Sequence, residues 1–247
     1  MKKLLLNNIK LVVFDVGKTI FDKECHEKIN VRYFVLKELL NKKGILVGIC
    51  TYRNEYEIKK ICSFEFDFYI LLNGSYIIFN NEVIFERKIS NKFINEDHLT
   101  VNNQHNYFSS KKAFNNAKNN GFAANLRGKL KYPYLITLFN KDNIFADQCS
   151  KNYNVSYWKD TGAVVLQSRD CSKINGIKKI TKFYQCSKDN VLYFGDGPND
   201  MDVFKELKFC IMVKNGLPEL KKHAFDKCEA CINDGVLNYL NNLLKEF

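Results

Sequence analysis

LVVFDVGKTIF, residues 11–21, is the stretch on which the fold of this chain depends. An apolar run over residues 11–14 ends abruptly at Asp15, and a small residue, a cation and a hydroxyl follow. Such a run is typical of a strand buried on both faces of a parallel sheet. An acid at the carboxyl end of that strand lies where open α/β sheets bind ligands. Asp15 alone is most simply explained as a turn-forming acid, so its meaning depends on its partners downstream.

The overall composition is that of an ordinary globular protein. The chain has 247 residues, of which 46% are hydrophobic and 26% charged, so we expect a packed core in one large domain or in one domain with an insert. The formal net charge of +11 is compatible with an anionic partner. The lysines are scattered without a dense basic block, so a small phosphorylated molecule is expected as the partner rather than nucleic acid. Oligomeric state is not readable from the sequence.

The nine cysteines show no framework spacing and are typical of the reduced thiols of a cytoplasmic protein. Cys228 and Cys231 have C-x-x-C spacing, but no second pair or pair of histidines completes a zinc site, and their role is left open. No apolar stretch approaches the roughly 18 residues of a membrane helix. The apolar run at the N-terminus breaks at Asn7 and is too short for a signal peptide. We therefore expect a cytoplasmic protein without a membrane segment.

Strand and helix patterns alternate along most of the chain, which is typical of a parallel α/β sheet. The predicted strands are 11–14, 45–50, 66–72, 164–167, 191–194 and 209–213. The predicted helices are 29–43, 53–63, 172–184, with Ser172 as N-cap, 201–207, 217–222 and 235–247. A hairpin is expected over 76–85.

The alternation is interrupted between residues 91 and 153, where strand signals are fewer and Asn and Lys abundant. A helix over 109–120 and a strand over 134–139 are expected there. We predict a parallel α/β core formed by residues 1–80 and 160–247, with an inserted α+β domain of residues 81–159. Basic groups of the insert could face an anionic substrate, although a solvated surface explains most of them more simply; they are Lys111, Lys112, Arg127, Lys129 and Lys131.

Four polar signals stand at the ends of predicted strands or at the start of a helix: Asp15, Thr51, Lys173 and the segment GDGPND, residues 195–200. In a doubly wound sheet these positions converge on one crevice. Carboxylates with one Lys and one hydroxyl suit a phosphate and a hard divalent cation such as Mg²⁺. A carboxylate can also attack phosphorus to form an aspartyl-phosphate. Each residue alone has a simpler structural explanation, as a turn acid, a helix-terminal charge or a solvated lysine, so the hypothesis depends on their joint occurrence.

The order and spacing of these residues resemble the haloacid dehalogenase (HAD) superfamily, specifically its Cof-type phosphatases, which carry a large cap inserted after the third strand. The segments that carry the resemblance are Asp15 to Thr19, Thr51 with Tyr52-Arg53, Asn73-Gly74, Lys173, Gly195 to Met201, Leu217 to Lys221 and Asp234 to Val236. The likeness covers about residues 9–90 and 155–246, whereas the insert matches only in position and size. It implies a HAD-like Rossmannoid core with an inserted cap.

The resemblance also implies roles for single residues. Asp15 would be the nucleophile, and Thr51 and Lys173 would hold the transferring phosphoryl group. Arg53 and Asn199 would belong to the phosphate-binding set, with Asn199 orienting Lys173 or the metal acids. The Mg²⁺ ligands would be Asp15, the backbone carbonyl of Gly17 and Asp196, with Asp200 close by through water.

The first motif departs from the family pattern D-x-D-G-T at two positions. Gly17 replaces the second acid, which normally protonates the leaving oxygen and then activates water, and Lys18 replaces the following glycine. Loss of a general acid–base group costs roughly 10²–10⁴-fold in rate, and acyl or aryl phosphates, whose leaving groups need less protonation, should suffer least. Lys18 could fill the vacated space, although a lysine that points to solvent is the simpler expectation.

Three functions are compatible with this pattern. The first is a Mg²⁺-dependent phosphohydrolase of a small phosphorylated metabolite, slowed or specialised at Gly17. The second is a catalytically silent relative that binds a phosphorylated ligand or a protein partner. The third is a phosphotransferase, such as a sugar-phosphate mutase, for which a longer-lived aspartyl-phosphate is useful.

Overall fold

A computed structural model describes residues 5–89, 100–102, 106–108, 134–138, 143–158 and 162–245 of the chain. The chain divides into two compact units. The first, the core unit, comprises residues 1–84 and 173–247, and the second, the inserted unit, comprises residues 85–172. The segment that forms the inserted unit therefore interrupts the sequence of the core unit. The assignment of these units as a catalytic core and a cap stays a prediction.

One eight-stranded sheet organises the core unit, in the order β13-β12-β11-β1-β2-β3-β4-β5. The strands are β1 Leu11–Phe14, β2 Leu46–Cys50, β3 Phe68–Leu71, β4 Tyr76–Phe79, β5 Glu82–Glu86, β11 Val191–Gly195, β12 Phe209–Val213 and β13 Asp226–Cys228. The strands from β13 to β3 are parallel to their neighbours, and β4 returns antiparallel to β3. The predicted α/β fold class is thereby confirmed.

Strand β1 lies inside the sheet between β11 and β2. All of its residues are buried, as are those of β11, so both faces of the sheet are covered there. The ring of Phe14 contacts Tyr33 and Phe194 with centroids 5.5 and 5.6 Å away, which fixes β1 between a helix and its neighbouring strand. The apolar run at residues 11–14 is buried for this reason.

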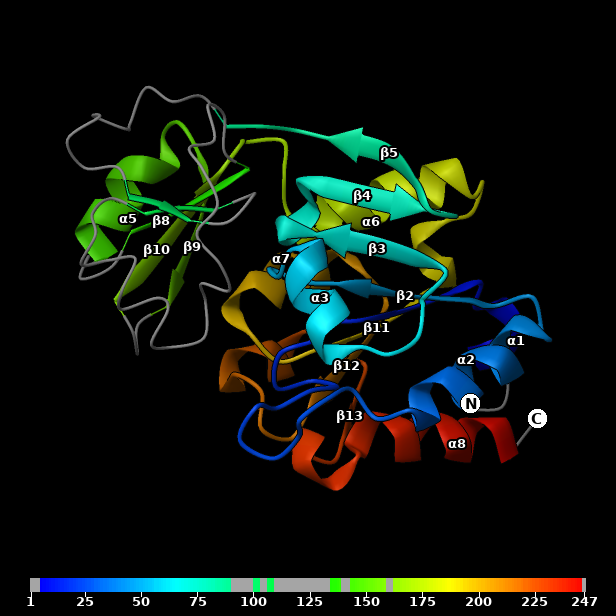
Figure 1. The fold of residues 1–247 in the computed structure, drawn as a ribbon. Helices are drawn as coiled ribbons and strands as arrows, with labels where there is room; N and C mark the ends of the chain where they lie inside the picture. Colours follow the sequence, from blue (N-terminus) through cyan, green and yellow to red (C-terminus); the bar gives the residue numbers. More distant parts are fainter. Residues whose placement is uncertain are drawn as a thin grey trace. The chain divides into compact units, whose positions relative to one another are not determined.

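The helices of the core unit are α1 Leu5–Asn8, α2 Arg32–Asn41, α3 Glu55–Ile61, α6 Lys173–Phe183, α7 Met201–Glu206 and α8 Gly235–Lys245. Helices α2 and α8 pack against each other and lie together on one side of the sheet (Figure 1), and α6 packs against α7. The predicted helices α2, α3, α6 and α7 are confirmed with shorter ends and α8 is confirmed as far as the chain is described, whereas residues 218–222 form a 3-10 helix. The short strand β13 was not predicted, because three residues carry too little pattern to be recognised.

The inserted unit contains a second sheet, in the order β6-β7-β8-β10-β9. Its elements are β6 Thr100–Asn102, β7 Asn106–Phe108, β8 Leu135–Leu138, α5 Asn143–Ser150, β9 Asn154–Trp158 and β10 Ala163–Gln167. Ile89, Ala146, Cys149, Val164 and Leu166 form a buried cluster in this unit. The strand predicted over 134–139 is confirmed as β8, while the helix predicted over 109–120 and the five basic residues of the insert lie outside the described residues.

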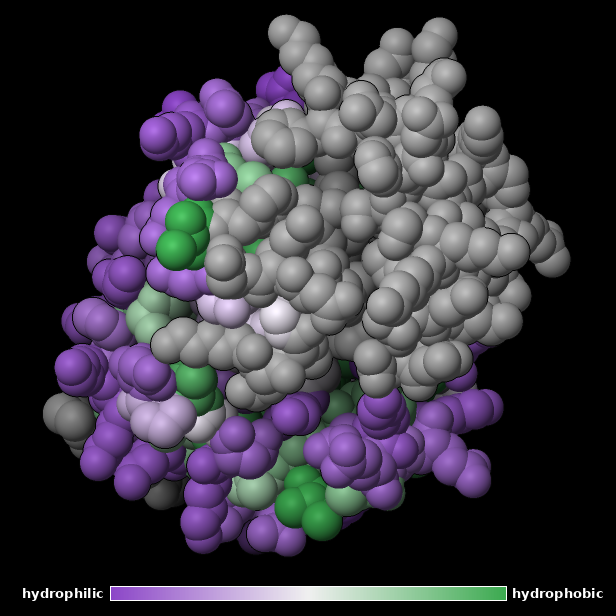
Figure 2. Space-filling model, turned by 90° about the vertical axis from the view of Figure 1, so that its left-hand side faces the viewer, coloured by the Kyte–Doolittle hydropathy of each residue, from purple (hydrophilic) through white to green (hydrophobic). Residues whose placement is uncertain are grey.

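The surface of the described residues is largely hydrophilic on the face shown in Figure 2, with small separate hydrophobic areas. In the described part of the chain, every helix is too short or too polar to cross a bilayer. All nine cysteines are free thiols, and Cys228 and Cys231 are both buried.

Helix α3 begins with a capping box that buries a carboxyl group. The side chain of Asn54 accepts from the backbone N–H of Glu57, and the carboxylate of Glu57 accepts from the backbone N–H of Asn54, both at 2.9 Å. Glu57 is only 6% exposed, and burial raises its pKa from 4.5 to about 6. The folded state therefore binds this proton more tightly than the unfolded state does.

We expect Glu57→Gln to change how stability depends on pH, because glutamine keeps the capping box but cannot titrate. The protonated acid favours folding, so wild type should gain stability relative to the variant as the pH falls from about 6 to about 4.5. The gain should total about 2 kcal/mol, and it should be lost again as the pH rises through 6. Urea unfolding of both proteins at pH 7.5 and 4.5 measures the difference. If wild type and variant differed in free energy of unfolding by the same amount at both pH values, the raised pKa of Glu57 would be contradicted.

Candidate active site

Three polar residues lie at adjacent strand ends in the middle of the core sheet. The register pairs Phe14 of β1 with Ile49 of β2 and with Phe194 of β11. Asp15 is the next residue after β1, while Thr51 and Asp196 lie one position further along their own strands. Parallel strands thus present Asp15 between a hydroxyl and a second acid, at the edge where open α/β sheets bind ligands. Asp15 and Thr51 are buried, with 6% and 2% of their surfaces exposed.

Lys173, the first residue of α6, joins two of the acids. Its Nζ donates to Oδ1 of Asp15 at 2.7 Å and to Oδ1 of Asp200 at 2.6 Å. The ammonium group is completely buried, so this ion pairing takes place away from water. Burial alone would lower the pKa of Lys173, but the carboxylates of Asp15 and Asp200 outweigh burial and raise it. The lysine therefore stays charged.

Asp200 accepts four hydrogen bonds from this chain. Its Oδ1 receives the ammonium of Lys173 and, at 2.5 Å, the hydroxyl of Tyr193. Its Oδ2 receives the backbone N–H groups of Asp196 at 2.9 Å and Gly197 at 2.8 Å. Gly195 makes this approach possible, because a Cβ at that position would lie 2.7 Å from Oδ2 of Asp200. A carboxylate has about four lone-pair directions, so these donors saturate it.

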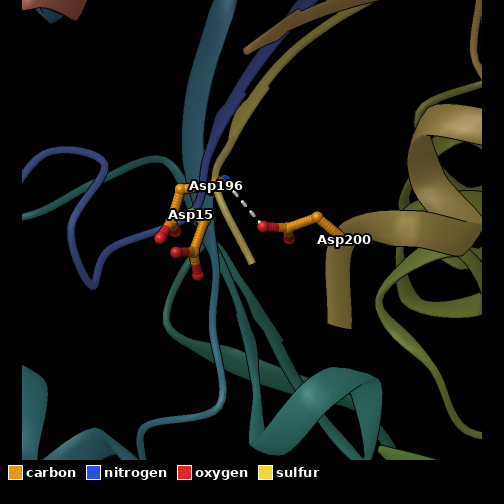
Figure 3. Close-up of side chains that lie close together, drawn as sticks. All are labelled: Asp15, Asp196 and Asp200. Carbon is orange, nitrogen blue, oxygen red and sulfur yellow. Dashed lines mark hydrogen bonds between the residues drawn. The ribbon is translucent and has the colours of Figure 1, made fainter. Parts of the chain in front are cut away.

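Asp15 and Asp196 lie side by side and are linked by Thr19. Figure 3 shows their carboxyl groups turned the same way at the strand ends, while Asp200 reaches the backbone of Asp196 from the following helical segment. The hydroxyl of Thr19 is 3.1 Å from Oδ1 of Asp196 and 3.4 Å from Oδ2 of Asp15. It has one proton, so it donates to one acid at a time, and the shorter contact favours Asp196. Sequence analysis gave this buried threonine no role, although its place in the first motif was the available signal.

Burial, together with the crowding of acids, raises the pKa values of Asp15 and Asp196. Burial raises the pKa of Asp15, and the ammonium of Lys173 offsets part of that effect. The pKa of Asp196 is raised well above its usual value by burial first and then by the charges of Asp15 and Asp200. One ammonium thus faces three carboxyl groups, and the excess negative charge is unfavourable in a buried site.

The donor set fits a hard divalent cation. Asp15, Asp196 and Asp200 each offer an oxygen, and these oxygens all lie within 4.8 Å of one another. Carboxylate oxygens are ligands that Mg²⁺ prefers, and a cation would relieve the repulsion that raises the pKa of Asp196. Asp15 and Asp196 are the better candidates for direct contact, because the four lone-pair directions of Asp200 already meet protein donors.

Gly17 leaves open space near the acids. A Cβ built on this half-buried glycine would find no heavy atom within 4 Å among the described residues. Lys18 is exposed to solvent and has a φ of 56°, the left-handed conformation that glycine adopts most easily. Its backbone carbonyl accepts from Asn215 Nδ2 at 2.8 Å. The loop therefore holds its turn without the glycine of the family pattern, and it has room for a side chain at residue 17.

Arg53 and Asn199 contact neighbours of the central acids. The guanidinium carbon of Arg53 lies 5.6 Å from the centroid of the Phe21 ring, beside the loop that follows Asp15. The side-chain amide of Asn199 donates to Oδ1 of Asn73 at 3.0 Å, and the backbone N–H of Asn73 donates to the carbonyl of Thr51. The predicted roles of Arg53 and Asn199 toward phosphate stay predictions.

Comparison with known proteins links this geometry to one family. The model of the haloacid dehalogenase-like hydrolases matches residues 12–240. A putative phosphatase of Bacillus subtilis, YkrA, is 25% identical over 92% of this chain and 95% of its own length. A phosphoglycolate phosphatase of Nitrosopumilus maritimus is 28% identical over 60% of this chain and 64% of its own length.

A solved structure agrees in fold. BT1666 of Bacteroides thetaiotaomicron, a phosphatase of the haloalkanoate (HAD) enzyme superfamily, superposes with a TM-score of 0.78 at 17% identity, over 95% of each chain. At this identity the superposition shows the common fold alone.

We expect Lys173→Met to destabilise the metal-free protein by about 3–5 kcal/mol, because it leaves buried carboxylates without their counter-charge. Lys178→Met is the matched control on the same helix. Lys178 pairs with Glu206 at 2.6 Å, but its side chain is 46% exposed, and such surface pairs contribute about 0–1 kcal/mol. Urea unfolding with a chelator present measures both variants. Equal losses of stability would contradict the central role of Lys173.

Proposed function

This chain belongs to the haloacid dehalogenase-like hydrolase family, and we propose that it is a Mg²⁺-dependent phosphatase that transfers the phosphoryl group of a small phosphorylated metabolite to Asp15 and then to water. The observation that carries the proposal is the buried contact of 2.7 Å between Lys173 and Asp15, next to Asp196. Relatives named as phosphatases support the same reaction.

Asp15 is the proposed nucleophile. Its Oδ1 is held by Lys173 and its Oδ2 lies near Thr19, so the carboxylate is fixed at the end of β1 before any substrate arrives. Such orientation lowers the entropic cost of reaching the transition state. Attack of one carboxylate oxygen on phosphorus would form an aspartyl-phosphate while the bond from phosphorus to the leaving oxygen breaks, so an alkyl, acyl or aryl phosphate would release an alcohol, a carboxylate or a phenolate.

Lys173 and Thr51 are the proposed phosphoryl-binding residues. An ammonium has three protons, and Lys173 gives one to Asp15 and one to Asp200. The third can meet an oxygen of the transferring group, where charge stabilisation in a buried site is strong. The hydroxyl of Thr51 is the corresponding donor on the neighbouring strand, and its backbone is fixed by a 2.8 Å bond to Ile70.

The proposed Mg²⁺ ligands are Asp15, Asp196 and the backbone carbonyl of Gly17. When bound, the cation would offset the charges of the carboxylates and of the phosphoryl oxygens. Asp200 is proposed to lie behind this set and to hold Lys173 and the backbone of residues 196 and 197. A cytoplasmic location stays a prediction, in agreement with nine free cysteines.

Gly17 divides the proposed activity into a part that is retained and a part that is impaired. The binding and nucleophilic groups are all present, but residue 17 cannot protonate a leaving oxygen or activate water. We infer that substrates with good leaving groups react fastest and that hydrolysis of the aspartyl-phosphate is slow. The same feature supports two alternatives, a silent phosphoryl-binding protein and a phosphotransferase that passes the group to a second acceptor.

We expect p-nitrophenyl phosphate to be hydrolysed only when Mg²⁺ is present, because its leaving group needs little protonation. Asp15→Asn should abolish turnover, since the amide cannot attack phosphorus. Release of nitrophenolate, followed by absorbance with Mg²⁺ or with EDTA, measures both effects. Turnover that survives in Asp15→Asn would contradict the proposal. A phosphoprotein that persists after acid quenching, is absent in Asp15→Asn, and passes its phosphoryl group to an added alcohol faster than to water would instead favour the phosphotransferase.

We expect Gly17→Asp to raise kcat/KM for an alkyl phosphate by about 10²–10⁴-fold, because the open space at this position can receive a carboxyl group that protonates the leaving oxygen. Gly17→Asn is the matched control, as it has the same size but cannot act as an acid. Initial rates at substrate concentrations below KM report formation of the aspartyl-phosphate, and with an alkyl and an aryl phosphate they measure the effect, which should be smaller for the aryl substrate. Equal rates for Gly17→Asp and Gly17→Asn would show that the missing side chain at residue 17 is not the acid–base group. Activity in Gly17→Asp with none in wild type would identify the chain as the silent relative.

A further inference from the structure

Tyr193 is a buried residue of β11 to which neither the sequence motifs nor the proposed reaction assigns a role. Its side chain is completely buried, and its hydroxyl lies 2.5 Å from Oδ1 of Asp200. The same oxygen receives the ammonium of Lys173 at 2.6 Å. Burial and the charge of Asp200 raise the pKa of Tyr193 well above its usual value, so the hydroxyl keeps its proton and is the donor.

Two donors on one oxygen restrict each other. An oxygen of a carboxylate has two lone-pair directions, and the tyrosine occupies one of those on Oδ1 while the lysine occupies the other. The opposite oxygen is held by two backbone N–H groups, which prevents the carboxylate from turning. Asp200 therefore holds the ammonium of Lys173 in one position, on the side opposite to its contact with Asp15.

The hydroxyl can be separated from the rest of the side chain. The ring of Tyr193 packs edge-on against Phe204, with centroids 6.2 Å apart and planes at 88°. A phenylalanine would retain this contact and lose only the hydrogen bond. A residue needed for packing alone would not require a hydroxyl in a fully buried position, where an unpaired polar group is costly.

We propose that Tyr193 is a positioning residue that acts through Asp200 to aim the ammonium of Lys173 at the transferring phosphoryl group. The proposal rests on the proposed function, since it concerns how that site holds a phosphoryl group in the transition state. Without the hydroxyl, Oδ1 of Asp200 gains a free lone pair and the ammonium gains freedom to move toward it. The precise placement of its third proton is then lost.

The test compares vanadate with inorganic phosphate, each bound to the full-length protein with Mg²⁺ and measured by calorimetry. Vanadate adopts the five-coordinate geometry of the transition state, so it senses the placement of Lys173 more strongly than phosphate does. Tyr193→Phe should weaken vanadate binding about tenfold, as expected for loss of a hydrogen bond to a charged group, and phosphate binding by less than about twofold. With an aryl phosphate, kcat should fall in parallel with vanadate affinity while KM stays within about twofold.

Tyr239→Phe is the matched control. Tyr239 also donates to a carboxylate, Oδ2 of Asp226 at 3.0 Å, and its ring also packs against an aromatic neighbour, Phe194. This variant should leave the ratio of vanadate to phosphate affinity unchanged. A variant that is merely unfolded in part loses binding-competent molecules, which lowers the stoichiometry but not this ratio.

A change of about threefold or more in the ratio for Tyr193→Phe, relative to Tyr239→Phe, supports the proposal, and a smaller change overturns it. Should Tyr193→Phe fail to fold, Tyr193→Met, which also lacks the hydroxyl and keeps a large apolar side chain, carries the test with the same threshold. Wild type that binds neither vanadate nor phosphate would instead overturn the proposed function. The calorimetry does not require turnover, so the two failures are distinguishable.

Discussion

The whole site depends on one buried ammonium that faces more negative charge than it can neutralise. Lys173 bonds to Asp15 and Asp200, while Asp196 lies beside Asp15 and has a pKa raised well above its usual value. Burying so many charges is unfavourable unless each has a partner. The parallel strands end together and so bring these charges to one place. The excess negative charge favours a divalent cation, which would in turn offset the negative charge of a phosphoryl group.

The site separates binding from proton transfer. The groups that would hold the cation and the phosphoryl group are fixed by short hydrogen bonds, whereas residue 17, beside the proposed nucleophile, has no side chain and open space around it. Removal of an acid–base group from such a site changes the rate and the range of substrates without removing affinity. A phosphatase, a phosphotransferase and a silent binder therefore differ here by what reaches the position next to Gly17, and not by the architecture around it.

Much of the core sheet and of the candidate site could be predicted from the sequence, because the patterns that identify them are local. The apolar run 11–14 followed by an acid identifies a central strand and its end, and GDGPND at 195–200 identifies a second. Tyr193 could not be predicted, since an aromatic residue within a strand is indistinguishable from core until its hydroxyl is placed against Asp200. The saturation of Asp200 likewise depends on two backbone N–H groups that no residue pattern reveals. Strand β13 could not be predicted either, because it is defined by its pairing with β12 and its three residues alone carry no strand pattern.

The most direct test of the account is a crystal structure of the wild-type protein grown with Mg²⁺ and vanadate. We expect a cation in contact with carboxylate oxygens of Asp15 and Asp196 and with the carbonyl of Gly17. We also expect vanadium next to a carboxylate oxygen of Asp15, with the vanadate oxygens held by Lys173 and Thr51. Asp200 should lie outside the coordination sphere of the cation and keep its hydrogen bonds to Tyr193 and Lys173. A cation bound elsewhere, or a vanadate that does not contact Lys173, would contradict the account.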